Sequence, residues 1–207
     1  MKVLLVNGSP NPKGCTFTAL SEVADALGKE GIETQILQIG RKPISGCIAC
    51  MKCKEIGKCV IDDIVNEFGE LAKTADGFVF GSPVYFASAA GAMTAFMDRA
   101  FFSPDWNVFY LKPAAAVVSA RRAGTTATFD QMNKYFTICQ MPIISSSYWN
   151  MVHGFTPEDV RQDLEGLQVM RNLGRNMAWF LRCKEAATKA GVALPEREEQ
   201  IFTHFIR

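Results

Sequence analysis

The sequence predicts an α/β protein built on a doubly wound, parallel β-sheet. Short apolar segments alternate with longer segments of helical periodicity along most of the 207 residues. Several apolar segments are continuous rather than alternating, as expected of strands that helices cover on both faces. No repeat or low-complexity linker interrupts the pattern, so we expect one domain over residues 1–207 with one inserted cysteine-rich loop.

Five segments are predicted to be strands. The first is an apolar run that Gly8-Ser9-Pro10 ends. Five strands in such an alternation favour the flavodoxin-like order 2-1-3-4-5. The predicted strands are Lys2–Val6, Glu33–Ile39, Gly77–Gly81, Pro113–Ser119 and Pro142–Tyr148.

Five segments are predicted to be helices. The last opens at Thr156, which suits an N-cap, followed by Pro157 at the first helical position. Its apolar residues recur every three or four positions as far as Leu181, so we expect one long final helix. The four earlier helices are predicted over Thr16–Lys29, Asp62–Ala75, Ser88–Phe102 and Thr125–Ile138.

Charge and composition exclude several classes of protein. The net charge is +1, from 22 basic and 21 acidic residues, so we expect neither a nucleic-acid nor a membrane partner. The first apolar run is too short for a signal peptide or a membrane span, and we therefore expect a cytoplasmic protein. Disulfides are rare in that compartment, so the seven cysteines are expected to have other roles.

The segment after the first predicted strand is suited to a phosphate group. Ser9 and Thr16 offer hydroxyls, and Gly14 allows close approach of the backbone where a helix begins. The free N–H groups of a helix start favour an anion. The spacing matches neither a P-loop nor a dinucleotide-binding glycine motif. A plain turn into a capped helix is the alternative.

Two further loops are expected at the same edge of the sheet. After the third strand, Tyr85 and Phe86 can present flat apolar surface to a planar ligand. After the fourth strand, Gly124 permits close approach, and Arg121 or Arg122 can hold negative charge on a flavin or a nicotinamide donor. The alternatives are two core aromatics and a pair of solvated arginines.

Three motifs in order resemble those of the NAD(P)H-dependent FMN reductase group of the flavodoxin superfamily. They are the first loop with its Cys15-Thr16, the run from Ala75 to Phe86, and Met97-Asp98-Arg99; the resemblance spans roughly residues 1–150. Cys15 departs from the polar residue that is common there, although its backbone N–H can still serve. The resemblance implies that the first loop holds the FMN phosphate and the other two loops border the isoalloxazine. The implied FMN-binding residues are Ser9, Asn11, Gly14, Cys15, Thr16, Pro83, Val84, Tyr85, Phe86, Ser119, Arg122 and Gly124.

Four cysteines form a compact motif in the irregular segment 43–60. Cys47, Cys50, Cys53 and Cys59 give C-x2-C-x2-C-x5-C, whose core has the spacing of bacterial ferredoxins. The motif resembles that of the iron-sulfur flavoproteins, a branch of the same superfamily that pairs FMN with a [4Fe–4S] cluster. Three alternatives stay open: a structural zinc site, redox-active thiols or a disulfide, and thiols that are simply buried.

The resemblance implies an FMN-dependent oxidoreductase that moves electrons from NAD(P)H to a small acceptor such as a quinone or a flavin. The alternative is an iron-sulfur flavoprotein electron carrier that ferredoxin reduces. A non-catalytic module with a zinc- or thiol-stabilised loop is the third hypothesis. Because the flavin supplies the chemistry, no catalytic side chain is predicted. We expect a homodimer or homotetramer, with the cysteine loop and Phe101–Tyr110 as candidate contact surfaces.

Four other residues carry weaker expectations. His153 follows the fifth predicted strand and is expected on the ligand side of the sheet, where a structural role is the favoured interpretation. Arg99 is expected to make a structural or subunit contact. Cys139 and Cys183 are expected to be buried small apolar residues.

Overall fold

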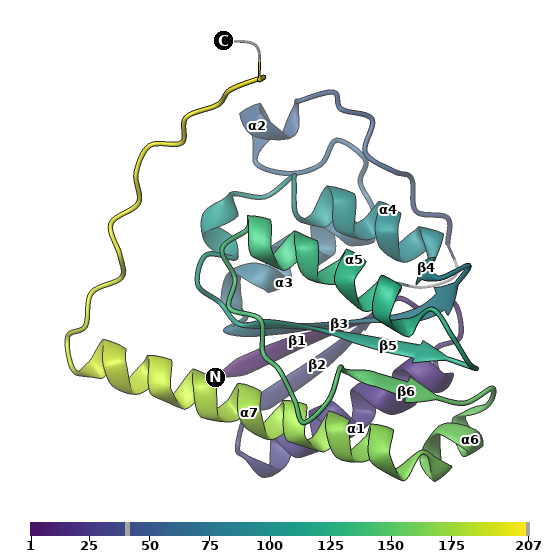
Figure 1. The fold of residues 1–207 in the computed structure, drawn as a ribbon. Helices are drawn as coiled ribbons and strands as arrows, with labels where there is room; N and C mark the ends of the chain where they lie inside the picture. Colours follow the sequence, from purple (N-terminus) through teal and green to yellow (C-terminus); the bar gives the residue numbers. More distant parts are fainter. Residues whose placement is uncertain (40–41, 206–207) are drawn as a thin grey trace.

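A parallel sheet forms the centre of the computed structural model, which describes residues 1–39 and 42–205 (Figure 1). Its strand order is β2-β1-β3-β5-β6, and a short strand β4 pairs antiparallel with β3. Counted along the chain, the five parallel strands have the order 2-1-3-4-5, so the predicted flavodoxin-like fold is confirmed. The strands are β1 (Lys2–Asn7), β2 (Glu33–Gln38), β3 (Gly77–Tyr85), β4 (Ser88–Ala89), β5 (Ala114–Ala120) and β6 (Met151–His153).

Helices cover both faces of this sheet. In Figure 1, α1 and α7 lie on one face, and α3, α4 and α5 lie on the other. None of the described helices is both long and apolar enough to cross a membrane. The helices are α1 (Cys15–Lys29), α2 (Cys53–Ile56), α3 (Ile64–Thr74), α4 (Gly91–Ala100), α5 (Thr125–Ile138), α6 (Pro157–Gln162) and α7 (Leu164–Lys189), with a 3₁₀ turn at Trp106–Val108.

Alternate residues of β1 enter the two halves of the core. Leu4 and Val6 pack with the apolar side chains of α3, α4 and α5, whereas Val3 and Leu5 pack with those of α1 and α7. All four side chains are fully buried. A strand covered on both faces reads as a continuous apolar run, which is why the sequence predicted it correctly.

The prediction of a fifth strand at Pro142–Tyr148 is wrong. Only Ile143 forms a bridge there, to the start of β5, and the edge strand lies later, at Met151–His153. The polar residues of the intervening segment bind α7 instead: Ser146 Oγ donates a 2.6 Å hydrogen bond to the carbonyl oxygen of Val169. The backbone is therefore drawn away from the sheet before it returns as β6.

The predicted final helix is two helices that meet at Asp163. Its Oδ1 accepts a 2.9 Å hydrogen bond from the N–H of Gly166 and so caps α7, while Oδ2 accepts one of 2.7 Å from the N–H of His153. Thr156 forms a capping box with Asp159 at the start of α6, which confirms the predicted N-cap. The interruption therefore anchors the end of the sheet to α7.

Burial differs from expectation at two places. Within the stretch Phe101–Tyr110, which was predicted as a candidate contact surface, Phe101 and Phe109 are buried in the core. Cys183 is exposed, whereas Cys139 is buried as predicted.

Candidate functional site

The loop between β1 and α1 lies at the carboxyl edge of the sheet. Helix α1 begins at Cys15, and its N-cap residue, Gly14, has no side chain with which to cap it. The N–H groups of a first helical turn have no acceptor within the helix and carry partial positive charge. This helix start is therefore suited to a phosphate group.

Two polar residues at the ends of strands hold this loop in place. Asn7 is fully buried; its Oδ1 accepts a 3.1 Å hydrogen bond from the N–H of Ser9, and its Nδ2 donates one of 2.6 Å to Gln38 Oε1. Gln38 Nε2 in turn donates a 2.7 Å bond to the carbonyl oxygen of Ser9. Neither residue was predicted from the sequence, although a polar residue that ends an apolar strand is a detectable signal.

The predicted phosphate-loop residues also bind one another and the neighbouring strand. Ser9 Oγ accepts a 3.1 Å hydrogen bond from the N–H of Asn11, and Asn11 Oδ1 accepts one of 3.3 Å from the N–H of Lys13. Thr16 Oγ1 lies 2.8 Å from Ser119 Oγ, and both residues are buried. The structure thus brings the first loop together with the end of β5.

The side chain of Cys15 is directed toward the loop that follows β6. Its Sγ lies 3.7 Å from the carbonyl oxygen of Gly154. Burial raises the pKa of the Cys15 thiol, which therefore stays protonated at neutral pH. Any contribution of Cys15 to anion binding comes from its backbone N–H.

A β-hairpin replaces the loop expected after the third strand. β3 continues to Tyr85, Ser88 pairs with it, and α4 begins at Gly91 rather than at Ser88 as predicted. The two turn residues, Phe86 and Ala87, have φ values of 53° and 57°, which are unfavourable for residues other than glycine. Phe86 is fully exposed at the tip, so a residue with an unfavourable φ carries an aromatic ring that lies in solvent and not in the core.

The hairpin is fixed against the loop that follows β5. Gly124 has a φ of +88°, and a Cβ at this position would lie 2.7 Å from the Cα of Ala87 and 2.9 Å from Val84 Cγ1. Pro83 pairs with Ser119 in the register of β3 and β5. The loops after β1, β3 and β5 therefore meet at one edge of the sheet, where doubly wound proteins bind ligands.

Residues of α5 and the last strand complete this edge. Gln131, which was not predicted from the sequence, accepts hydrogen bonds through Oε1 from Ser88 Oγ at 2.8 Å and from the N–H of Ala89 at 2.9 Å. Arg122 is exposed in the turn that follows β5. His153 lies in β6, with Nδ1 3.9 Å from Asp163 Oδ2, in agreement with a structural role.

The four cysteines of the predicted metal site surround a small cavity between the cysteine loop and α4. All four line this cavity, with Cys53 buried, Cys59 partly buried, and Cys47 and Cys50 exposed. The backbone reaches this arrangement through positive φ values on both sides of Cys50, at Ala49 (52°) and Met51 (61°). The structure thus brings the four predicted ligands together around one space.

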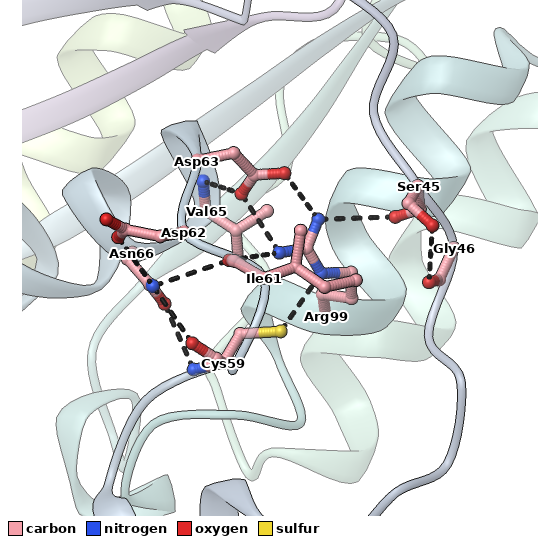
Figure 2. Close-up of polar contacts among 9 residues, drawn as sticks. All are labelled: Ser45, Gly46, Cys59, Ile61, Asp62, Asp63, Val65, Asn66 and Arg99. Carbon is pink, nitrogen blue, oxygen red and sulfur yellow. Dashed lines mark hydrogen bonds and ion pairs between the residues drawn. The ribbon is translucent and has the colours of Figure 1, made fainter.

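Cys59 is the most firmly held of the four. Its backbone N–H donates a 3.0 Å hydrogen bond to Asn66 Oδ1, and its carbonyl oxygen accepts one of 3.0 Å from Asn66 Nδ2 (Figure 2). Its Sγ accepts a 3.2 Å hydrogen bond from Nε of Arg99. The predicted structural contact of Arg99 is therefore made with the cysteine loop.

The cysteine loop supplies the number and type of ligands that a [4Fe–4S] cluster takes. All four thiols line one cavity, and such a cluster is held by four cysteine thiolates. Four cysteines can also hold a structural zinc ion. Among the described residues, no three potential ligand side chains already form a group that could hold a metal ion.

Comparison with known proteins identifies the family. Residues 1–156 match the family model for NADPH-dependent FMN reductase. The chain is 36% identical over 187 residues to an iron-sulfur flavoprotein from Methanocaldococcus jannaschii, covering 86% of this chain and 96% of that protein. It is 28% identical to an iron-sulfur flavoprotein from Methanosarcina thermophila, covering 86% and 93% of the two chains.

Solved structures of low sequence identity show the same fold. RosB, crystallised with the intermediate 8-demethyl-8-formylriboflavin-5′-phosphate, superposes with a TM-score of 0.70 at 14% identity, covering 100% of this chain and 94% of RosB. A flavodoxin from an archaeon gives 0.57 at 16% identity, covering 88% and 99%. Because the family model covers most of the chain, this protein belongs to the NADPH-dependent FMN reductase family and is an FMN-binding oxidoreductase.

Proposed function

We propose that this protein transfers electrons between two centres, an FMN at the carboxyl edge of the sheet and a [4Fe–4S] cluster in the cysteine loop. The observation that carries the proposal is the cavity lined by Cys47, Cys50, Cys53 and Cys59. The relatives named iron-sulfur flavoproteins support it. When bound, FMN exchanges one or two electrons and the cluster exchanges one.

The proposed FMN site assigns a role to each of the three loops. The loop from Ser9 to Thr16 binds the phosphate through hydroxyls and the N–H groups at the start of α1. The hairpin residues Pro83–Phe86 border the ring on one side, and Ser119–Gly124 flank it on the other. These residues bind and orient the flavin, and the transfer of electrons requires no acid or base from them.

Direct reduction by NAD(P)H is the second candidate for the electron source. The family description favours it, as do the exposed Arg121 and Arg122 beside the proposed ring site, which can attract the phosphates of a nicotinamide dinucleotide. The acceptor would then be a small molecule such as a quinone or a free flavin. The first candidate for the electron source is a ferredoxin, which supplies single electrons through the cluster.

Anaerobic purification followed by flavin, iron and sulfide assays tests the two-centre proposal. The expected result is one FMN with about four iron and four sulfide per chain. Cys53→Ser and Cys59→Ser are expected to lose the iron and keep the FMN. Cys183→Ser, at an exposed cysteine remote from the cavity, is the matched control and keeps both. A chain that holds zinc, or FMN without iron, contradicts the proposal.

Mixing the same protein with each donor separates the two electron sources. Under anaerobic conditions the flavin absorbance is followed after addition of NADPH and, separately, of reduced ferredoxin. Bleaching by ferredoxin alone identifies an electron carrier, and rapid bleaching by NADPH identifies the reductase. Loss of NADPH bleaching in Arg121→Ala and Arg122→Ala would locate the nicotinamide beside the loop after β5.

We also propose a homodimer or homotetramer. An apolar groove with walls at Phe102, Tyr135 and Ile138 adjoins the cysteine loop. The chain after α7 runs as an extended segment away from the sheet (Figure 1). In this segment Phe202 and Phe205 are exposed. Apolar surface of this kind is commonly covered by another chain. Light scattering at working concentration tests the proposal, and a monomer contradicts it.

A further inference from the structure

Arg99 engages all five N–H donors of its guanidinium group in the cysteine loop and its flanks (Figure 2). Nε donates to Cys59 Sγ at 3.2 Å. Nη1 donates to Asp63 Oδ2 at 2.6 Å and to the carbonyl oxygen of Ser45 at 3.3 Å. Nη2 donates to Asp63 Oδ1 at 2.9 Å and to the carbonyl oxygen of Ile61 at 2.8 Å. Only 1% of the Arg99 side chain is exposed, whereas its partner Asp63 is 25% exposed, so the guanidinium is buried beneath partners that reach the surface.

The partners of Arg99 lie at the two ends of the cysteine loop. Ser45 precedes the first cysteine of the motif, and Ile61 follows the last. Arg99 itself belongs to α4, which packs in the core. A single buried side chain on a rigid helix therefore holds both ends of the loop. Lysine cannot replace it, because one ammonium group lacks the planar fork that reaches five acceptors.

The bond from Arg99 distinguishes Cys59 from the other three cysteines. A cationic N–H donates to its sulfur, whereas the sulfur of Cys47 accepts a 3.4 Å hydrogen bond from the neutral backbone N–H of Ala49. A hydrogen bond from a charged donor is about twice as strong as one between neutral groups. Asp63 accepts hydrogen bonds from both Nη atoms of the guanidinium and offsets part of its charge.

Building on the proposed function, we propose that Arg99 is a positioning residue that sets the reduction potential of the cluster through Cys59. One-electron reduction adds negative charge to the cluster and its sulfur ligands. A cationic donor at a ligand sulfur favours the state with more negative charge and so raises the potential. By the same argument, Asp63 lowers the potential because it offsets the charge of Arg99.

The test measures the midpoint potential of the cluster in variants that are expected to shift this potential in opposite directions. Arg99→Gln and Arg99→Lys remove or weaken the bond to Cys59, and we expect lower potentials than in the wild type. Asp63→Asn leaves the Nε of Arg99 and its acceptor Cys59 unchanged, removes the acceptor Oδ2 that Nη1 now uses, and leaves the guanidinium charge uncompensated, so we expect a higher potential. An Asn at this position still caps α3, where Asp63 Oδ1 now accepts a 3.0 Å bond from the N–H of Val65.

A matched control removes a positive charge elsewhere. Lys112 Nζ donates to the carbonyl oxygen of Ala72 at 3.0 Å and lies outside the residues that line the cysteine cavity. Lys112→Met is expected to leave the cluster potential unchanged. Circular dichroism and FMN content identify any variant that fails to fold, and iron retention against a chelator reports the closure of the loop. We expect faster iron loss from Arg99→Gln than from Lys112→Met.

The outcomes separate this inference from the proposed function. If the wild-type protein binds no iron, both fail. If it binds a cluster, and neither the potential nor the electron paramagnetic resonance spectrum of the reduced protein changes in Arg99→Gln, only the role of Arg99 is overturned. If the Arg99 variants do not fold, Asp63→Asn decides: a higher potential supports the inference, and an unchanged or lower one overturns it.

Discussion

The hydroxyl oxygens of Thr16 and Ser119 lie 2.8 Å apart where the first turn of α1 meets the end of β5. Both side chains are buried, at 1% and 4% exposure. This contact joins the proposed phosphate loop to the loop that flanks the proposed flavin ring. The two parts of the proposed FMN site are therefore linked in the protein alone.

Removing the Thr16 hydroxyl should weaken FMN binding. Thr16→Val keeps the shape of the side chain but removes a hydroxyl that can donate to the phosphate, and a hydrogen bond to a charged group contributes about 1.5–3 kcal/mol. We expect the dissociation constant for FMN to rise by roughly 10-fold or more. Ser119→Ala should lower the free energy of unfolding by about 1 kcal/mol and affect FMN less. Fluorescence titration of the apoprotein measures both constants, and equal affinities in the wild type and Thr16→Val would contradict the assignment.

The strained hairpin tip predicts a conflict between stability and function. Phe86→Gly relieves a positive φ and should stabilise the protein by about 1 kcal/mol. It also removes the exposed ring, so we expect weaker FMN binding or slower reduction of the flavin. Ala87→Gly is the matched control, because it relieves a similar φ without removing an aromatic group. Thermal unfolding and flavin titration separate the two effects; if Phe86→Gly keeps full flavin affinity and reduction rate, the ring has no such role.

Close packing at Gly124 predicts that a single methyl group there is harmful. Gly124→Ala places a Cβ 2.7 Å from the Cα of Ala87 and adds the strain of a positive φ. We expect a loss of roughly 1–3 kcal/mol in the free energy of unfolding together with weaker FMN binding. Gly191→Ala has a φ of +80° and open space around it, so it reports the strain alone. Equal losses in the two variants would show that the contact with the hairpin is unimportant.

Burial of Cys139 predicts a loss of stability in alkali. Burial raises the pKa of this thiol to about 11, above the value of about 8.5 for an exposed cysteine. The unfolded chain therefore loses this proton first as the pH rises. The contribution of the buried Cys139 thiol to the free energy of unfolding is complete below about pH 8.5 and decreases as the pH approaches 11. Urea unfolding at pH 8 and pH 10.5 should show a larger decrease for the wild type than for Cys139→Ala, and parallel decreases would count against the shifted pKa.

The sequence was most informative where burial decides the structure. The strand that ends at Asn7 was predicted because every apolar residue in it is buried on one face or the other. The segment from Pro142 to Tyr148 has the composition of a strand, but Ser146 binds the backbone of α7 instead. Such a competing hydrogen bond depends on the distant Val169 and leaves no local signal.

The positions of the loops in the candidate site could be predicted, but their conformations could not. The three loops follow from the topology, since parallel strands end at one edge. The hairpin was missed because its turn, Phe86-Ala87, lacks the Asn-Gly or Asp-Gly pair that usually marks such turns. The role of Arg99 at Cys59 was missed because the two residues are forty positions apart and meet only in the fold.

Titration of the apoprotein with FMN under anaerobic conditions decides whether the loop between β1 and α1 binds a flavin phosphate. We expect saturable quenching of flavin fluorescence at one FMN per chain, with much weaker binding of riboflavin, which lacks the phosphate. Thr16→Val should reduce the difference in affinity between FMN and riboflavin. Absence of binding in both the oxidised and the reduced state, or equal affinity for FMN and riboflavin, would contradict the assignment of the loop between β1 and α1 to a flavin phosphate.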